Sequence, residues 1–455
     1  MTMGTAGPRS GNFPIAAESR EAREAAARDG RALTPTERII AGVEARTPEE
    51  AIERTLTNEM LADARPGVRQ PMLINLGPNH PSTHGVLRLI VELDGEVVRE
   101  VTPVIGYLHT GIEKQCENKT WWQGITLVTR MDYLAPFANI KAYTMSVERL
   151  LQMEVPARAQ WIRVLLAEMN RLASHLVWLG TSGLELGAMS VFFYCYRERD
   201  EMLDLFEMVS GERMNHRYFQ VGGCSDDLPP GFIERVRAFT EEMPARIDDY
   251  EALLTGNPIW KDRMVGIGVL PAEQLLALGV TGPTLRAAGV PYDLRKVAPY
   301  SGYQHFEFDV PTATEGDCYA RYLVRVREMR ESLRIIRQVL DGMPEGPVIA
   351  DDRKVVLPPR EELAYSMEAL IHHFKLVSEG FTVPAGEAYV AIESPRGEMG
   401  CYAVSDGGPR PYRIHMRDPS FVNLQATAPL CKGGYLADLI AIVATLDPVM
   451  GGVDR

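Results

Sequence analysis

The sequence predicts an α+β fold that is mostly α, with a large helical body between two smaller β-rich regions. Three observations predict it. Residues 86–93 and 97–105 are rich in β-branched apolar side chains, whereas long stretches between 156 and 378 place apolar residues at helical spacing. Strand-like sequence returns between 387 and 416. A chain of 455 residues can bury a large core without disulfides or a structural metal.

Residues 1–66 predict a charged helical or partly disordered extension. They are rich in Ala, Arg and Glu and contain one aromatic residue, Phe13. Helix starts are expected at Thr34 and Thr47, because each is followed by Pro and has Glu three residues later. The domain that follows, residues 67–455, is expected to carry the chemistry.

Three regions are expected within this domain. The first, 71–106, predicts a β-hairpin, because Asp94-Gly95 separates its two strand-like runs. The second, 110–380, is the helical body. The third, 383–455, predicts β-hairpins and a last helix at 434–446. The helices expected in the body cover residues 156–180, 189–210, 232–254, 318–340 and 361–378, with Gly180 and Gly211 as C-terminal stops of the first two.

Five arginines lie along the expected helix 318–340. They predict either a contact with an acidic partner subunit or a solvated face. They are Arg321, Arg325, Arg330, Arg334 and Arg337.

Composition and missing motifs exclude several function classes. With 48 Lys+Arg against 61 Asp+Glu, the net charge of −13 argues against nucleic acid as a partner. No apolar stretch is long enough to span a bilayer. Phosphate-loop and H-E-x-x-H motifs are missing, and Gly266-Ile267-Gly268 lacks the third glycine of a dinucleotide fingerprint.

The six cysteines show no C-x2-C or C-x4-C spacing, which iron–sulfur and zinc sites usually have. They are also too sparse for a disulfide scaffold. We therefore expect ordinary small apolar residues in a reducing compartment, and no cofactor bound by this chain alone.

The densest polar cluster is the segment 77–85, Gly-Pro-Asn-His-Pro-Ser-Thr-His-Gly. Its prolines restrict the loop, and its imidazoles and hydroxyls suit the binding and protonation of a small oxygen-bearing ligand. Two other interpretations stay open. His80 and His84 could be a metal pair, which would require a helix and a third ligand, or the segment could be a polar turn with satisfied histidines.

Four motifs in order resemble one family. They are Asn-His-Pro-Ser-Thr-His-Gly at 79–85, Tyr-Leu-His-Thr-Gly at 107–111, Met-Asp-Tyr at 131–133 and Leu-Glu-Leu-Gly-Ala-Met at 184–189. Together they resemble the 49-kDa subunit, also called the D subunit, of proton-pumping NADH:quinone oxidoreductase, respiratory complex I. The resemblance runs from about residue 72 to the C-terminus and leaves the extension uncovered.

That family is similar to the large subunit of nickel–iron hydrogenases, so the resemblance implies a hydrogenase-large-subunit-like fold. Hydrogenases hold their metals with R-x-C-G-x-C and D-P-C-x-x-C, which correspond to 130–135 and 447–452 here. Because such a centre requires thiolate ligands, this chain is not expected to be a hydrogenase. We expect a cavity for a quinone head-group in place of the metal. The four thiolate positions hold Asp132, Ala135, Val449 and Gly452.

The resemblance also implies roles for single residues. His84 and Tyr133 would donate hydrogen bonds to the two quinone carbonyls, where negative charge builds up on reduction. Glu185 would partner His84 in the proton response, although many members have Asp there and a direct contact is left open. Thr181 and Met189 are weaker candidates for quinone binding, and Met189 could instead be an apolar contact inside a helix bundle.

The implied context is a shared enzyme. Electrons would come from the terminal [4Fe–4S] cluster on an adjacent small subunit, and ubiquinone or menaquinone would be the substrate. The other implied partners are a 30-kDa-type subunit and membrane-arm subunits at the quinone entrance. The expected location is the cytoplasmic side of the cell membrane, as a peripheral protein. Two alternatives stay open: a scaffold without a quinone role, and a relative that takes electrons from ferredoxin or a reduced deazaflavin.

Overall fold

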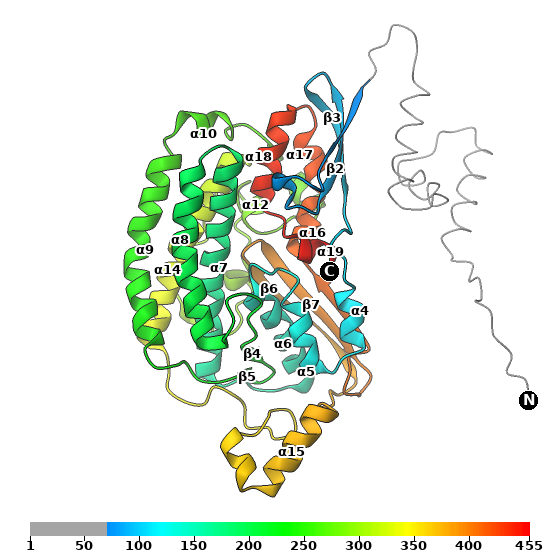
Figure 1. Ribbon diagram of the computed structural model, residues 1–455, viewed down its shortest axis with the longest axis vertical. Helices are drawn as coiled ribbons and strands as arrows, with labels where there is room; N and C mark the ends of the chain where they lie inside the picture. Colours follow the sequence, from blue (N-terminus) through cyan, green and yellow to red (C-terminus); the bar gives the residue numbers. More distant parts are fainter. Residues whose placement is uncertain (1–70) are drawn as a thin grey trace, which may run out of the picture. The chain divides into compact units, whose positions relative to one another are not determined.

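The computed structural model describes residues 71–455, so the expected extension 1–66 and its two helix starts lie outside the described residues. Strands β1 (Met72–Leu76), β2 (Arg88–Asp94) and β3 (Val97–Val104) form one sheet in that order (Figure 1). β2 and β3 pair antiparallel, and Gly95 between them has a positive φ of 66°. The predicted hairpin at Asp94-Gly95 is therefore confirmed.

Four long helices pack side by side as the helical body (Figure 1): α7 (Ala157–Glu185), α8 (Met189–Ser210), α9 (Phe232–Leu254) and α14 (Cys318–Gly342). The prediction that α7 ends at Gly180 is wrong. A Cβ at Gly180 would lie 3.3 Å from side-chain atoms of Cys195 and Tyr196. The glycine is thus an interhelical contact that lets α8 approach α7, and α7 continues to Glu185.

The arginines of α14 do not share one environment. Arg321 and Arg325 are buried, so both interpretations of the series, a partner contact and a solvated face, are wrong for these two. Arg330 and Arg334 lie on another side and pair with carboxylates of the same chain, Arg330 with Asp248 at 2.7 Å. The residue spacing puts 321 and 325 on the packed face of α14 and 330 and 334 on its outer face.

The helix expected at 361–378 is broken. A 3-10 turn, η4 (Arg360–Ala364), comes first, and α15 (Met367–Ser378) follows. The Ser366 hydroxyl accepts a hydrogen bond from the Ala369 N–H at 3.2 Å, so Ser366 caps α15 and fixes its start.

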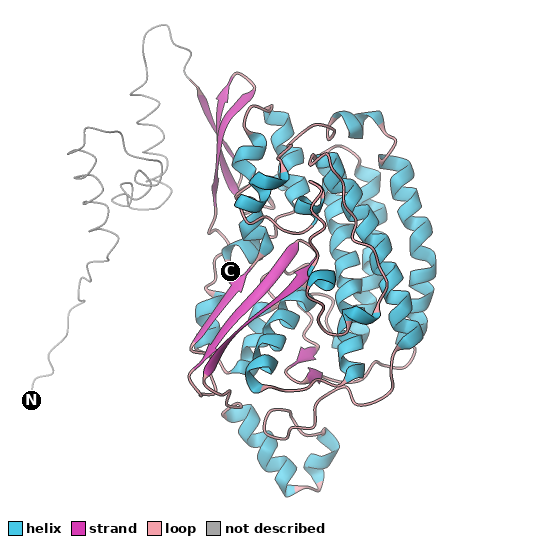
Figure 2. Ribbon diagram, turned by 180° about the vertical axis from the view of Figure 1, so that it is seen from behind, coloured by secondary structure: helices cyan, strands magenta, loops and turns pink. Residues whose placement is uncertain are grey.

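The C-terminal third contains a second sheet of β6 (Gly386–Ser394), β7 (Gly397–Ser405) and β8 (Arg413–Arg417) in antiparallel order. Figure 2 shows this sheet from behind, and its β6 and β7 strands pack on α6 (Pro136–Leu151). The sequence did not predict the two-residue strands β4 (Phe219–Gln220) and β5 (Gly223–Cys224), which are too short to leave a periodic pattern. The last helices are α18 (Leu436–Leu446) and α19 (Met450–Asp454).

The two sequence ends of this domain meet. Val98 exchanges backbone hydrogen bonds of 2.8 Å with the 433–434 turn. The Asp454 carboxylate accepts hydrogen bonds from the N–H groups of Gly106 and Leu108 at 2.8 and 2.6 Å. The N-terminal motifs are therefore held against the C-terminal helices, although more than 300 residues separate them.

The predicted fold class, α+β and mostly α, is confirmed. All six cysteines are free and buried, as expected. Within residues 71–455, no helix is both long and apolar enough to cross a membrane, and no three His, Cys, Asp or Glu side chains form a group that could hold a metal ion. The shorter helices are α4 (Ile112–Glu117), α5 (Trp121–Val128), α10 (Pro258–Asp262), α11 (Ala272–Ala277), α12 (Pro283–Arg286), α13 (Leu294–Val297), η3 (Tyr303–His305), α16 (Pro419–Leu424) and α17 (Thr427–Cys431).

Candidate functional site

The loop that carries His84 is fixed by its own hydrogen bonds. A 3-10 turn, η2 (Pro81–Thr83), lies between two histidines. The first, His80, is used locally, because its Nδ1 lies 2.6 Å from the Ser82 hydroxyl and 3.2 Å from the Ser82 N–H. The Thr83 hydroxyl donates to the His80 carbonyl at 2.9 Å. His84 then ends the turn with a positive φ of 53°.

The His84 imidazole is reached by solvent and is also surrounded by protein. The residue is exposed. Burial nevertheless lowers the pKa of its imidazole, while Asp447 raises that pKa and Arg396 lowers it. The two observations agree if protein encloses most of the ring and leaves one side open. At neutral pH, His84 is then a neutral imidazole with one N–H donor.

Tyr133 lies just before α6, beneath the C-terminal helix α19. A Cβ at Gly451 would lie 2.3 Å from the Met131 carbonyl oxygen and 3.1 Å from Cδ1 of Tyr133. Glycine is therefore required at 451 for α19 to pack on this segment. Tyr133 is half-buried, and burial raises the pKa of its hydroxyl, which Arg396 lowers and Asp132 and Asp447 raise. The phenol stays a hydrogen-bond donor throughout the neutral range.

Glu185 is the last residue of α7 and is only partly exposed. Its Oε2 atom is buried without a hydrogen-bond partner among the described residues. Burial and the nearby charge of Asp447 raise the pKa of this carboxyl to about 7. A helix C-terminus also disfavours negative charge. The Glu185 carboxyl can therefore gain and lose a proton near neutral pH.

A buried ion-pair network joins the segments around these residues. Arg396 donates from Nη1 to Asp132 Oδ2 at 2.9 Å and from Nη2 to Asp447 Oδ1 at 3.2 Å. It also donates to the Asp447 carbonyl and to the Ser174 hydroxyl, both at 2.9 Å. Asp447 has a positive φ of 53° at the end of α18, and its Oδ2 is without a partner in the described chain.

The four former thiolate positions lie inside the protein, and the quinone cavity expected there stays a prediction. Asp132, Ala135, Val449 and Gly452 are all buried. A Cβ at Gly452 would lie 2.2 Å from Asp418 Oδ2, so the Asp418 carboxylate would have to move to admit a larger side chain there. Among the donors of the site, His84 is exposed and Tyr133 is half-buried.

The three predicted site residues share one electrostatic neighbour, because the charge of Asp447 shifts the pKa of His84, Tyr133 and Glu185 alike. No hydrogen bond joins Glu185 to His84 among the described residues, and what the two groups have in common is the nearby charge of Asp447. In the sequence, Asp447 stood out only as the first residue of the 447–452 motif, and no role was predicted for Asp447 or Arg396. For Asp447, its position in a motif that had lost its thiolates was the available signal.

The two weaker candidates differ. The Thr181 hydroxyl donates to the Val177 carbonyl at 2.9 Å, so its proton is used within α7. Met189 is 57% exposed at the start of α8, which excludes the interpretation that it packs inside the helix bundle.

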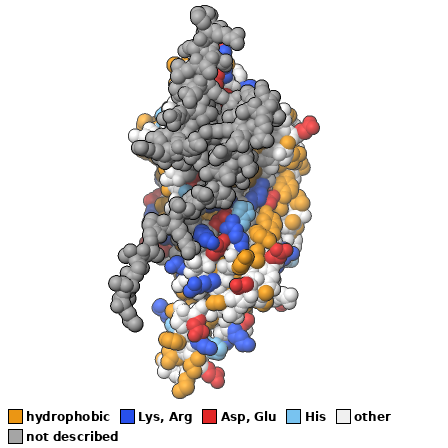
Figure 3. Space-filling model, turned by 90° about the vertical axis from the view of Figure 1, so that its right-hand side faces the viewer, with side chains coloured by type: hydrophobic (Ala, Val, Ile, Leu, Met, Phe, Trp, Pro, Cys, Tyr) orange, Lys and Arg blue, Asp and Glu red, His pale blue; other side chains and the backbone are white. Residues whose placement is uncertain are grey.

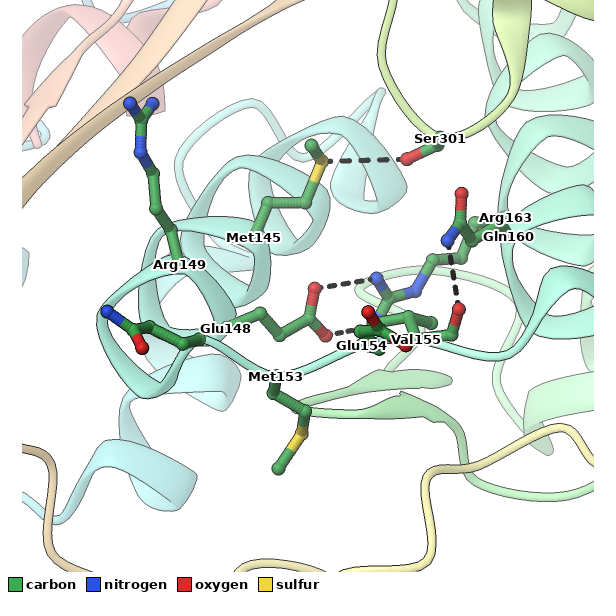
Figure 4. Close-up of a pocket in the computed structure, with 10 residues that line it drawn as sticks. Met145, Glu148, Arg149, Met153, Glu154, Val155, Gln160, Arg163 and Ser301 are labelled. Atoms are coloured by element: carbon green, nitrogen blue, oxygen red, sulfur yellow. Dashed lines mark hydrogen bonds and ion pairs between the residues drawn. The ribbon is translucent and has the colours of Figure 1, made fainter.

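A cavity of about 530 Å³ lies elsewhere, between the end of α6 and the start of α7 (Figure 4). Glu148 and Arg163 form a 2.6 Å ion pair in its wall, and Glu148 also accepts the Gly222 N–H at 2.8 Å. None of the five predicted site residues lines this cavity.

Comparison with known proteins gives the same family throughout. A family model described as the 49-kDa subunit of respiratory-chain NADH dehydrogenase matches residues 185–455. The NADH-quinone oxidoreductase D subunit of Acidothermus cellulolyticus is 55% identical over 413 residues, 87% of this chain and 93% of that protein. The D subunit of a Parafrankia species is 58% identical over 400 residues, 84% of this chain and 88% of that protein. The D 2 subunit of Chloroflexus aurantiacus is 55% identical over 412 residues, 90% and 98% of the two chains. This chain therefore belongs to the family of 49-kDa subunits of respiratory-chain NADH dehydrogenase.

Proposed function

We propose that this subunit forms part of the quinone site of an NADH:quinone oxidoreductase and helps to protonate quinone as it is reduced. One observation carries the proposal: two accessible or half-buried donors, His84 and Tyr133, and one carboxyl that titrates near neutral pH, Glu185, share the charge of Asp447. Donors and a proton source around one place are what a two-electron, two-proton reduction of a quinone requires.

The donors suit the developing charge. Both His84 and Tyr133 are neutral at pH 7, so each gives an N–H or O–H to an oxygen without first losing a proton. When two electrons reach the quinone, negative charge grows on both carbonyl oxygens, and fixed donors stabilise it. Their rigid backbone anchors, the η2 loop and the segment under Gly451, keep the donors in place.

Glu185 is the better proton source of the three. Its carboxyl carries a proton for about half the time near pH 7, whereas burial disfavours the imidazolium form of His84. As the oxygens become basic, Glu185 gives one proton to the quinone and solvent supplies the second, and Glu185 is left as a carboxylate that solvent must reprotonate. The new charge faces Asp447, and this repulsion is a source of electrostatic change that membrane subunits could use for proton translocation.

Electrons would arrive from a [4Fe–4S] cluster on an adjacent small subunit. Further partners are a 30-kDa-type subunit and membrane-arm subunits, which would hold this chain as a peripheral protein on the cytoplasmic side. The quinone would be ubiquinone or menaquinone. A scaffold without a quinone role is the competing function, and it would not need the paired donors.

Tyr133→Phe and His84→Ala in assembled membranes test the proposal. Loss of one donor should lower NADH-to-quinone activity by about 100-fold, the usual cost of removing a preorganised donor. NADH-to-ferricyanide activity should stay at the wild-type level, because those electrons leave upstream. His372→Ala is the matched control, since His372 lies on α15 and belongs to neither the η2 loop nor the site. If NADH-to-quinone activity survives both changes, the quinone-site proposal is wrong and the scaffold function remains.

A further inference from the structure

Helix α15 leaves an apolar face uncovered. Its apolar residues recur every three or four positions, so they share one side of the helix. Met367 is 76% exposed and Phe374 is 69% exposed, whereas Ala369 and Leu376 on the opposite side are buried. In Figure 3, hydrophobic side chains gather at the lower end of the molecule, where α15 lies in Figure 1. We call this set the α15 face: Tyr365, Met367, Leu370, Ile371, Phe374 and Val377.

An acidic cleft borders the α15 face. It has a volume of about 890 Å³, and Val377 of α15 is part of its wall. Four carboxylates line it, against two guanidinium groups. One of these, Arg353, is bonded to Glu362 outside the lining at 2.6 Å. Likewise, Asp227 is bonded to Arg158 outside the lining at 2.9 Å, so three carboxylates against one guanidinium group remain and the cleft has an excess of negative charge. The four carboxylates are those of Asp226, Asp227, Asp351 and Asp352.

We propose that the α15 face and the acidic cleft bind one segment of a neighbouring subunit of the same enzyme, a segment with large apolar side chains next to two or more Lys or Arg. An apolar helix face of this size on a subunit of a larger enzyme marks a contact surface. The charge of the cleft then selects among occupants. A second copy of this chain would bring the same carboxylates, and an anionic lipid surface would be repelled in the same way.

Site-specific photocrosslinking in the purified, assembled enzyme tests this occupant. Benzoylphenylalanine in place of Phe374 should crosslink to one peptide of a neighbouring subunit, and mass spectrometry should find apolar residues and at least two Lys or Arg in it. The matched control is the same probe in place of Glu368, an exposed position of α15 outside the α15 face, which should give much less product. Products with another copy of this chain, with its residues 1–70 or with lipid, or no product at all, would overturn the proposal.

Charge reversal tests the cleft separately. In an enzyme without the crosslinking probe, Asp226→Lys combined with Asp351→Lys should weaken the binding of the subunit that crosslinking identified. That subunit should dissociate at a lower salt concentration than in the wild-type enzyme, because the new charges repel its basic residues. Glu307→Lys, an exposed carboxylate outside the cleft, should leave that concentration unchanged. Equal release by both variants would overturn the assignment of a basic segment. Since the readout is subunit retention, failure of this proposal and failure of the quinone site are distinguishable.

Discussion

Two buried ionic clusters lie in the same domain, and their carboxyl groups behave in opposite ways. The core cluster consists of Glu168, Arg171, Asp293 and Arg295. Burial alone would raise the pKa of Glu168, but Arg171 and Arg295 bring it to about 2. Arg295 overcomes burial in the same way at Asp293, whose pKa is also about 2. The Glu168 carboxylate accepts a further hydrogen bond from the Tyr303 hydroxyl at 2.6 Å.

The site cluster consists of Asp132, Arg396, Asp447, Asp418 and Glu185. Among the described residues, Arg396 is the one cation that hydrogen-bonds to these carboxyl groups. Burial and the charge of Asp132 raise the pKa of Asp418 to about 6, and the pKa of Glu185 rises to about 7. One oxygen each of Asp418, Asp447 and Glu185 is buried without a partner there.

The difference teaches that the ratio of cations to carboxylates, and not burial, separates the two roles. Paired cations keep the core carboxylates ionised, so these charges are permanent and fix the packing of helices. A shortage of cations leaves the carboxyls of Asp418 and Glu185 close to a protonation change at neutral pH. A carboxyl that is to supply protons must lie in a cluster with few cations, as in the site cluster.

The largest expected effect is the loss of a core cation. Arg295→Met would leave Glu168 and Asp293 buried with too little positive charge, which costs about 3–5 kcal/mol of folding stability. We expect little assembled enzyme and a strongly lowered melting temperature. Arg334→Met, which removes an exposed pair with Asp309, is the control and should change stability by less than about 1 kcal/mol. A fully stable Arg295→Met enzyme would contradict the structural role of the core cluster.

Glu185→Gln should act on turnover and leave the fold intact. The amide cannot supply a proton, so we expect NADH-to-quinone turnover to fall by about 10-fold to 100-fold, with a smaller change in the quinone KM. Wild-type turnover should decline as the pH rises through about 7, because Glu185 loses its proton there. The variant should lack this step in its pH profile. An unchanged profile would remove Glu185 from the proton path.

How much of this could be read from the sequence depends on the range of the interaction. Helix α9, residues 232–254, and the Asp94-Gly95 hairpin follow from local sequence patterns. The boundaries of α9 and the turn of the hairpin were both predicted correctly. Gly180 was misread as a stop, because its role depends on Cys195 and Tyr196 of another helix. Asp447 had no predicted role for the same reason. Its influence on Glu185 exists only after the ends of α7 and α18 meet.

Asp447→Asn should move the pH profile without removing it. The charge of Asp447 helps to raise the pKa of Glu185, so its neutralisation should lower that pKa. The decline in quinone turnover should then begin at a lower pH than in the wild-type enzyme, while burial keeps the pKa above the usual 4.5. The measurement is NADH-to-quinone turnover from mildly acidic to mildly alkaline pH, with ferricyanide activity as the control. A shift to higher pH would contradict the coupling.

The smallest expected effect is on folding stability, and the direction in which stability changes with pH differs between the two clusters. The pKa of Glu185 is raised from 4.5 to about 7, so the folded state loses stability as the pH rises through this range. Glu185→Gln removes that loss. Screening of a partly exposed carboxyl limits the gain at pH 8 to about 1 kcal/mol, or about 1–2 °C in melting temperature, with no gain near pH 5.

In the core cluster the pH dependence of stability has the opposite sign. Glu168, with its pKa lowered to about 2, stabilises the fold above pH 4.5, and this contribution fades only as the pH falls toward 2. Thermal unfolding of the assembled enzyme at pH 5 and pH 8 measures the difference. A Glu185→Gln enzyme that is less stable at pH 8 would mean that the carboxylate is bound by an unseen partner, and that the site cluster resembles the core.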